Sequence, residues 1–513
     1  MSFFSSKKIG AAFFLLMAVT LSAIGCVTVG PDYQRPPVEP SSRWLESEDS
    51  RLSPSLPIQQ AWWEGFEDPV LNRLVETAYK ENLTLRQAGL RVLEARAQLA
   101  LAMGGLYPQS QQVSGDLQYF RASERSLQAG VIPLSYGQAQ VQFSAAWEID
   151  FWGKYRRAIE SARAGWQGSL DDYDNALVSL TADVANAYFL IRTLEKRIDI
   201  ARQNAKAQAE SLEIAQARLR YGSTAQLDVE QAKTVLNNTL ASIPLLEAQL
   251  TQTGNALSLL LGLPPSDLKG LLQGTSGTTV YPRQVAVGIP ADLLRRRPDI
   301  RSAEHAAAAQ SALIGVAKAD LYPAFSLAGF FGFLSTDTGA NRIIDIANWN
   351  SRTWQVGPAF QWTVLDYGRT KNKIRIQDAR LEQLLTAYQN TVLKAQQEVE
   401  SALAGFLKSQ DRADYLAKSA EAAKKALELS SLQYREGIKD FTTVLVSQLA
   451  LLNAQDSLVD TLGSTYINLV GVYRALGGGW EIREGQALVP EEIKQKMARR
   501  TDWGGLLDLS SEY

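Results

Sequence analysis

The sequence repeats itself at a fixed separation of 215 residues, and no gap is needed to keep the two copies in register. The matched pairs include Leu106-Tyr107-Pro108 with Leu321-Tyr322-Pro323, Trp147 with Trp362, Gly153 with Gly368, and Leu261-Gly262 with Leu476-Gly477. Solenoid repeats are only 20–50 residues long. Each copy is therefore expected to be half of a molecule, built from several helices and strands.

Composition restricts the classes of protein that the chain can belong to. A net charge of -2 and a pI near 5.8 give no reason to expect nucleic acid as a partner. Beyond the N-terminal segment the sequence contains no run of 18 apolar residues, which a spanning helix would need. If this chain crosses a membrane, it is expected to do so with strands.

The single cysteine, Cys26, excludes an intrachain disulfide and a thiol metal cluster. It follows the basic pair Lys7-Lys8, an apolar stretch over 9–24 and small residues, a pattern that resembles a bacterial lipobox. We predict a signal peptide over 1–25 and acylation of Cys26. Ala23 departs from the leucine that is usual there, and the alternative is an ordinary signal peptide with an incidental cysteine.

Four alternating segments predict strands over 111–120, 138–147, 325–333 and 355–363, with polar loops over 121–136 and 334–353. Each strand has one apolar face ending in aromatics and about the ten residues that a tilted transmembrane strand needs. We interpret the polar faces as the lining of a wet lumen; the alternative is a solvent-exposed sheet face. The candidate lumen residues are Asp116, Gln118, Gln140, Gln142, Gln355 and Gln361.

Apolar residues at three- and four-residue spacing predict two very long helices, over 153–221 and 385–434. At about 1.5 Å per residue the first would be a rod of roughly 100 Å. A helix of about half that length is predicted at the start of each copy, over 69–103 and 290–320. A second helix of similar length follows the glycine that ends each long helix, over 226–261 and 442–476. Laid end to end, two half-length helices would match one rod.

The expected division has six parts. They are the signal peptide (1–25), an extended N-terminal segment (26–67), the first repeat (68–263), a connecting segment (264–289), the second repeat (290–477) and a C-terminal segment (478–513).

These residues together resemble the TolC/OprM-type outer membrane factor family, in its lipidated efflux branch. The resemblance rests on Cys26 followed by Val29-Gly30-Pro31-Asp32-Tyr33, on both Leu-Tyr-Pro segments, and on the two Trp-x5-Gly pairs that begin at Trp147 and Trp362. It implies an α+β, mainly α fold. Three protomers would form a 12-stranded outer-membrane β-barrel continuing into a 12-helix tunnel. Each protomer would supply four strands and long coiled-coil helices in two repeats.

The resemblance implies a passive exit duct in the outer membrane that extends into the periplasm. Its partners would be two further copies of the chain, a periplasmic membrane fusion (adaptor) protein, an inner-membrane pump of the RND type, and outer-membrane lipid. The alternatives are a type I protein-secretion duct and a periplasmic coiled-coil adaptor that transports nothing. Adaptors normally lack paired amphipathic strands of this length.

The turns between each rod and its return helix are candidate gate and adaptor-docking sites, because the resemblance places both functions there. The candidate residues are Arg218, Arg220, Gly222, Asp228, Tyr434, Arg435, Gly437, Lys439 and Asp440. Opposite charges on neighbouring helices could latch the tips, each exposed pair contributing about 0.2–1 kcal/mol. Where the family has a ring of aspartates, this sequence has Thr443 and Val446, with Asp440 as the acidic alternative.

No feature of the sequence predicts an enzyme, a cofactor or a metal site. The only histidine, His305, stands among alanines, so no Ser/His/Asp set can be assembled around it. Gly477-Gly478-Gly479 lacks the spacing of a phosphate-binding loop. Energy for transport is therefore expected to come from a partner.

Overall fold

The computed structural model describes residues 28–37, 41–53, 60–125, 133–265, 268–273, 285–288, 290–339 and 341–508. They form two compact units. The first unit contains Met1–Pro36, Leu93–Gly168 and Ala303–Tyr388, and the second contains Pro37–Val92, Ser169–Ser302 and Gln389–Tyr513. The predicted signal peptide and Cys26 lie outside the described residues.

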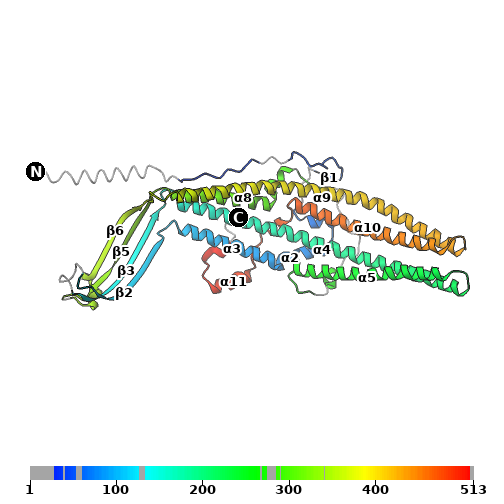
Figure 1. The fold of residues 1–513 in the computed structure, drawn as a ribbon, viewed down its shortest axis with the longest axis horizontal. Coiled ribbons are helices and arrows are strands. Elements are labelled where there is room, and N and C mark those ends of the chain that lie inside the picture. The colour runs from blue at the N-terminus through cyan, green and yellow to red at the C-terminus, as the bar shows by residue number, and fades with distance from the viewer. Residues whose placement is uncertain are drawn as a thin grey trace. The chain divides into compact units, whose positions relative to one another are not determined.

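The first unit contains a four-stranded antiparallel sheet (Figure 1). Its strands, in spatial order, are β2 (Ser110–Arg121), β3 (Ser135–Ile149), β5 (Ala324–Thr336) and β6 (Arg352–Gln361). The four predicted strands are confirmed, and all four are longer than the alternation indicated; β6 also begins and ends a few residues earlier than predicted. Two short 3-10 helices, η3 (Ile343–Ala347) and η4 (Trp349–Ser351), occupy the loop between β5 and β6.

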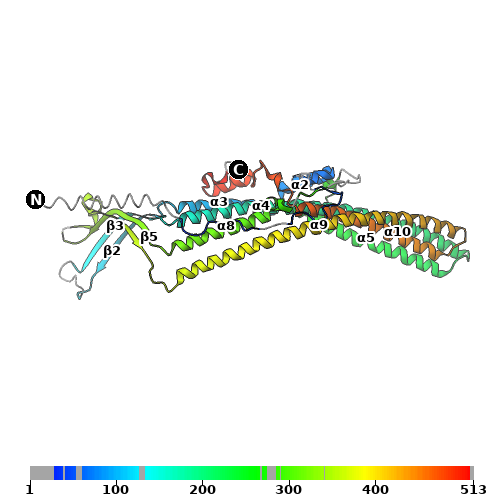
Figure 2. The same cartoon turned by 90° about the horizontal axis from the view of Figure 1, so that it is seen from above.

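The helices of the two repeats match in length. Helices α4 (Lys154–Arg220) and α9 (Arg369–Arg435) each have 67 residues, and both contribute to both units. The return helices α5 (Gln226–Leu260) and α10 (Phe441–Ala475) each have 35 residues. In the second unit the hairpins α4–α5 and α9–α10 lie side by side (Figures 1 and 2). Among the described residues, no helix is long and apolar enough to span a membrane.

The predicted start of the second long helix, Leu385, is wrong, because α9 begins at Arg369. Residues 369–384 are mostly polar, so they carry little of the apolar periodicity on which the prediction depended. They contain neither proline nor glycine and are rich in Arg, Lys, Gln and Leu, which favour helix. Here helix propensity indicates the element better than the apolar pattern.

The predicted helix over 69–103 is two helices, α2 (Pro69–Glu81) and α3 (Leu83–Gly104). Asn82 between them is extended, with ψ 123°, and its side chain accepts a hydrogen bond of 2.7 Å from the Leu85 amide. An asparagine in this conformation is a favourable N-cap, so the break starts a new helix. At the other end of α2, Asp68 is the N-cap and accepts a 2.9 Å hydrogen bond from Val70 N.

The predicted helix over 290–320 is also interrupted. It consists of η2 (Pro290–Asp292), α7 (Leu293–Arg296) and α8 (Pro298–Ala319). Arg297 is extended, as expected for a residue before proline, whose ring disfavours the helical conformation of its predecessor.

Segments outside the repeats add structure to the second unit that the sequence did not indicate. Strand β1 (Leu52–Ser53) pairs in parallel with β4 (Val285–Ala286). The connecting segment also contains α6 (Lys269–Leu272), and the C-terminal segment contains η5 (Trp480–Arg483), α11 (Glu491–Arg500) and η6 (Gly504–Leu507).

Aromatic residues form the core of the second unit. The 3-10 helix η1 (Trp62–Phe66) inserts three of them, Trp62, Trp63 and Phe66. Trp62 stacks on Tyr473 at 5.2 Å, Phe66 meets Phe189 at 4.9 Å, and Phe189 stacks on Tyr466 at 4.8 Å between ring centroids. Buried aromatic side chains contribute large apolar areas, so the contacts fix the N-terminal segment against α4 and α10.

A buried ionic cluster joins the C-terminal segment to the first repeat within the second unit. Asp174 on α4 is fully buried between two arginines: Arg301 Nη2 on α8 lies 2.7 Å and Arg483 Nη2 on η5 lies 3.0 Å from its Oδ2. Arg301 also contacts Asp171 at 2.8 Å, and both guanidinium groups lie over the Trp480 ring. Burial raises the pKa of Asp171 to about 7, although Arg301 opposes the shift.

Candidate functional site

The register of the sheet places all six predicted lumen residues on one face. Asp116 pairs with Gln140 across β2 and β3, and Gln142 lies on the same face two residues further along β3. Gln118 shares this face, and so do Gln355 and Gln361 on β6. Phe330 and Leu334 of β5 also lie there, so the face is less uniformly polar than the first strand pair suggested.

The opposite face of the sheet is apolar across all four strands. Many large side chains on this face are more than two-fifths exposed, as in Leu117 (72%), Phe143 (48%), Phe331 (43%) and Phe360 (70%), whereas Trp147 and Phe333 are partly buried. An apolar patch on this scale is rare on the surface of a soluble monomer and indicates contact with a membrane or a protein. The sheet is thus two-faced, with amides and a carboxylate on one side and aliphatic and aromatic groups on the other.

The two repeat-matched tryptophans fix the ends of the sheet. Trp147 Nε1 donates to the Leu106 carbonyl oxygen at 3.1 Å, and Trp362 Nε1 donates to the Leu321 carbonyl oxygen at 3.0 Å. The accepting residue is in both cases the leucine of a Leu-Tyr-Pro segment. This geometry shows both tryptophans packing the turns where strand and helix meet; Trp362 is also half exposed.

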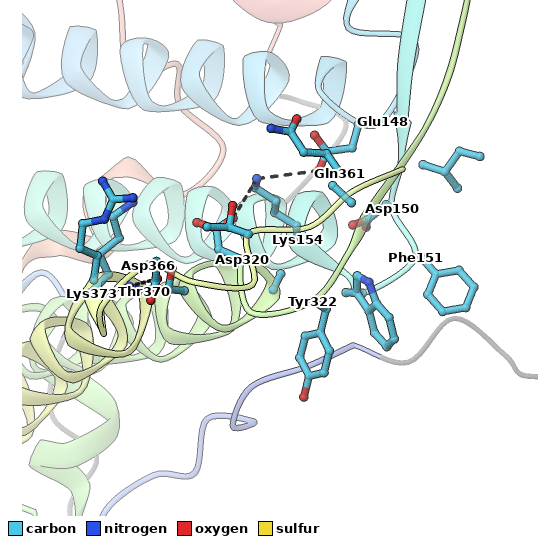
Figure 3. A pocket seen from close by; sticks show the side chains of 16 residues that line it. Glu148, Asp150, Phe151, Lys154, Asp320, Tyr322, Gln361, Asp366, Thr370 and Lys373 are labelled. Atoms are coloured by element: carbon cyan, nitrogen blue, oxygen red, sulfur yellow. Dashed lines mark hydrogen bonds and ion pairs between the residues drawn. The ribbon is translucent and has the colours of Figure 1, made fainter. Parts of the chain in front are cut away.

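A polar cavity of about 370 Å³ lies in the first unit where strands give way to helices (Figure 3). Lys154 Nζ lies 3.1 Å from Asp320 and 3.8 Å from Glu148. Burial alone would lower the pKa of Lys154, but Asp320 and Glu148 outweigh it and the pKa is raised. The ammonium therefore stays charged.

Sequence reasoning missed the aspartates that begin the two long helices. Asp150 accepts the Tyr155 and Arg156 amides at 3.0 Å each, and Asp366 accepts the Gly368 and Thr370 amides at 2.9 and 2.7 Å. Hydrogen bonds from Thr370 and Gly368 lower the pKa of Asp366 to about 2. A sequence pattern could have identified these helix starts: each aspartate is followed by aromatic residues and then by a glycine, and both glycines have positive φ.

The two tip turns have the same backbone structure. Gly222 (φ 71°) ends α4, with bonds from its amide to Leu219 and from the next amide to Arg218. Gly437 (φ 76°) ends α9 with the equivalent pair of bonds. This is the Schellman motif, in which a left-handed glycine satisfies the last carbonyl groups of a helix. The predicted turn glycines are therefore confirmed as helix terminators.

The two tips meet in a small hydrophobic cluster within the second unit. Its buried members are Ala215, Val229, Ala232, Val235, Tyr434, Phe441, Val444 and Leu445. The Tyr434 ring packs against Phe441 in a tilted arrangement, 5.1 Å between ring centroids, and the Arg218 guanidinium lies over the Tyr434 ring at 4.2 Å. Arg218 also donates to the Arg435 carbonyl oxygen at 3.1 Å. An arginine and a tyrosine therefore join the two tips inside one chain.

The predicted tip charges are not paired with one another in the described chain. Asp228 accepts a short hydrogen bond from the Thr224 hydroxyl, and no ion pair joins it to Arg220, Arg435 or Lys439. Asp440 is the N-cap of α10, accepting from Thr443 N at 3.0 Å and from Thr443 Oγ1 at 2.7 Å, and these bonds lower its pKa. Among the described residues, no acidic or histidine cluster has the arrangement of a metal site.

The chain just after Cys26 is fixed to the first unit. Val29 N donates to the Trp152 carbonyl oxygen at 3.0 Å, and Arg157 binds both the Val29 carbonyl and the Asp32 carboxylate, the latter at 2.7 Å. Arg35 forms a two-pronged ion pair with Glu304. Sequence reasoning expected an extended segment here, but did not identify these partners.

Comparison with known proteins agrees with the internal repeat. The sequence model of the family described as outer membrane efflux protein matches residues 74–263 and again residues 289–478, two matches that are 215 residues apart. Nodulation protein T of Rhizobium leguminosarum bv. viciae is 31% identical over 472 residues, covering 91% of this chain and 94% of that protein.

Two further similarities cover nearly the whole chain. The pyoverdine export outer membrane protein OpmQ of Pseudomonas putida is 31% identical, covering 91% of this chain and 97% of that protein. The structure of the outer-membrane channel OprN superposes with a TM-score of 0.81 at 32% identity, over 88% of this chain and 100% of that one. The chain therefore belongs to the outer membrane efflux protein family and is an efflux channel of the outer membrane, not an enzyme.

Proposed function

We propose that three copies of this chain close into one channel, in which the sheets form the outer-membrane wall. The observation that carries the proposal is the open sheet: among the described strands, β2 and β6 each pair on one side only. An unpaired strand edge is costly in lipid, and membrane barrels have at least eight strands. Four strands cannot close, whereas three sets of four can.

The orientation of the sheet follows from its two faces. The apolar face, with Leu117 and Phe360, would contact lipid, and the face with Asp116, Gln118, Gln140, Gln142, Gln355 and Gln361 would line the lumen. The reverse orientation would place a carboxylate in hydrocarbon, which is energetically costly.

Trimerisation is tested on protein purified in detergent. Light scattering should give the mass of three chains, and the unheated sample should migrate as a heat-resistant oligomer on a gel. Planar-bilayer conductance is measured on the same preparation. A chain that remains monomeric while it conducts ions would refute the trimer.

We further propose that the tip turns form a gate at the periplasmic end. Among the described residues, no ion pair joins Asp228 to a cation and none joins Arg220, Arg435 or Lys439 to a carboxylate, although the charge of Lys439 acts on its chain neighbour Asp440. In a trimer these groups would face a neighbouring chain. Exposed pairs contribute about 0.2–1 kcal/mol each, so the latch would yield to an adaptor.

Neutralising Asp228→Asn together with Lys439→Gln tests the latch. Losing about 1 kcal/mol would raise the open probability up to about fivefold in planar bilayers. The control is Glu230→Gln with Lys233→Gln, which removes a 2.9 Å pair within α5 near the same tip and should leave conductance unchanged. Equal conductance in both variants would contradict the latch.

The partners proposed for the tips are a periplasmic adaptor and, behind it, an inner-membrane pump of the RND type. Apolar side chains at the tips support docking: Tyr221 and Leu227 on the first tip and Ile438 and Val446 on the second are all more than three-fifths exposed. Tyr221→Ser with Ile438→Ser should reduce export in cells and leave single-channel conductance unchanged. Export at the wild-type level would exclude this surface from docking.

The lipid anchor proposed at Cys26 holds the mature N-terminus in the outer membrane. The attachment of residues 29–35 to the first unit supports it, because the chain is fixed a few residues after the cysteine. Intact mass of the mature protein should show acyl groups on residue 26. An unmodified cysteine, or a start elsewhere, would refute the anchor.

A further inference from the structure

The apolar face of the sheet contains a groove that its register explains. On β3 and β5 the small pair Ala145 and Gly329 lies between two large pairs, Phe143 with Phe331 and Trp147 with Leu327. The result is a cavity of about 330 Å³, lined almost entirely by apolar groups. Gly329 cannot be larger, because a Cβ there would lie 2.7 Å from the Gln355 carbonyl oxygen.

The described part of the N-terminal segment begins at Thr28, beside the turn between β3 and α4. Glycines allow its backbone to sit directly on the helices: a Cβ on Gly315 would lie 2.7 Å from the Val29 carbonyl oxygen, and one on Gly153 would lie 2.5 Å from the Thr28 side chain. The Arg157 guanidinium, whose side chain is only 5% exposed, holds Val29 and Asp32 from one side. The position of Thr28 is therefore fixed within this unit.

A continuous series of aromatic rings leads from that point to the apolar face. Val29 bonds to the Trp152 carbonyl, and the Trp152 ring lies 4.8 Å from Phe151. Phe151 lies 5.6 Å from Phe325, which is on the apolar face beside Phe360 at 6.5 Å. A lipid chain attached just before Thr28 would thus emerge onto apolar surface.

The dimensions fit an acyl chain. Cys26 precedes Thr28 by two residues, which span at most about 7 Å from Cα to Cα. Thr28 contacts Gly153, just after the end of β3 at Ile149, and Ala145 lies four residues before that end, about 13 Å along a strand. Acyl chains in one leaflet of a bilayer extend about 15 Å. The groove is within the reach of the chain's own anchor.

We propose that an acyl chain carried by Cys26 lies in the groove between the Trp147–Leu327 and Phe143–Phe331 pairs of the same protomer. This inference rests on the proposed acylation and on the proposed lipid-facing side of the sheet. The anchor then forms part of the outer wall of the channel. Arg157 acts as a positioning residue, because it fixes the segment that delivers the lipid to the groove.

Photo-crosslinking tests the occupant. Benzoylphenylalanine is placed at Phe331, inside the groove, or at Val113, which is on the same apolar face but on β2. Cells are fed an alkynyl fatty acid, outer membranes are irradiated, and peptides are analysed by mass spectrometry. Because the anchor is tethered, cross-linking to the peptide that carries residue 26 should be roughly tenfold higher at 331 than at 113.

Two variants test how the lipid is delivered. Arg157→Ala should reduce the yield at 331 to that at 113, whereas Lys154→Ala should not, because the Lys154 ammonium pairs with Asp320 and Glu148. If Arg157→Ala does not form the heat-resistant oligomer, Ala145→Phe is used instead. This substitution fills the groove and should abolish the cross-link at 331.

Equal yields at the two positions, or cross-links at 331 only to phospholipid or lipopolysaccharide, would overturn the inference while leaving acylation and the channel intact. Intact mass separates these outcomes from the failure of the anchor itself. An unacylated Cys26 would remove both the anchor and this inference, and planar-bilayer conductance would still report on the channel.

Discussion

The middle of α4 is buried around two acids, Asp171 and Asp174, whereas the matched residues of α9 are Thr386 and Gln389, both exposed. The helices have the same length and the same end structures, so the difference arises from what packs on them. Only α4 receives the C-terminal segment through Arg483. The repeats diverge where a segment outside the repeats binds one of them.

The tips differ in a second way. The second tip has the aromatic pair Tyr434 and Phe441, where the first has Leu219 and Gln226. Helix α10 begins with the side-chain cap of Asp440, whereas α5 begins at Ala225 without a side-chain cap. The second tip is therefore the better-packed and better-capped half of a joint made by both.

The largest expected effect is at the buried acid of α4. Asp174→Ala removes the buried carboxylate that Arg301 and Arg483 share, and should lower the free energy of unfolding by about 3–5 kcal/mol. The measurement is urea unfolding followed by circular dichroism. The matched control on α9, Gln389→Ala, should change it by less than about 0.5 kcal/mol. Comparable losses in both variants would show that the two matched positions contribute equally to the free energy of unfolding.

A pH dependence between about pH 4 and 7 should arise from Asp171 in the first repeat. The folded-state pKa of Asp171, about 7, is above the roughly 3.9 of an unfolded aspartate. The folded state therefore binds the proton more tightly, and this contribution is present at low pH and lost as pH rises through 7. Stability relative to Asp171→Asn should increase by up to about 1.4 kcal/mol per unit between pH 7 and 4. If the difference in stability between the wild type and Asp171→Asn does not change with pH, the raised pKa of the buried Asp171 is contradicted.

Replacing Tyr434 with the leucine of the first tip tests the aromatic joint. Tyr434→Leu removes the ring contact with Phe441 and the cation–π contact with Arg218. The two contacts together should contribute about 1–2 kcal/mol to the stability of the tip. Hydrogen exchange of the first amides of α10 should accelerate correspondingly. Tyr415→Leu, on the same helix but 73% exposed, is the control and should leave those amides unaffected.

Exchanging the caps should produce the smallest effect. Asp440→Ala should lower helix stability at the second tip by about 1 kcal/mol, because Thr443 N loses its acceptor. Ala225 has a similar extended conformation, so Ala225→Asp should raise stability at the first tip by a similar amount. Proteolysis at each turn measures both. A first tip that gains nothing would mean that Thr224 and Asp228 already supply the cap.

The sequence predicted the elements that recur and missed those that occur once. Strand alternation and the glycines at 222 and 437 needed only local patterns, and both are confirmed. The pairing of β1 with β4 joins residues more than two hundred apart in a contact two residues long, too short for any periodicity.

The sequence predicted the polar face of the sheet better than it predicted the contacts at the tip turns. Alternation alone placed six polar side chains on one face of the sheet, because a strand's side chains alternate strictly. At the tips, charge was the only visible clue. The contact between Arg218 and Tyr434 depends on how two hairpins cross, which spacing within either hairpin does not specify.

The constant separation of the two repeats also records a history. A duplicated gene normally accumulates insertions and deletions, yet residues 74–263 and 289–478 match the same family pattern with nothing gained or lost between them. In a helix, one added residue rotates everything beyond it by about 100°, and in a strand it exchanges the two faces. Selection has therefore preserved the length of the two repeats more strictly than the identity of their residues. Future changes in this lineage are expected as substitutions within the repeats and as insertions only at their turns.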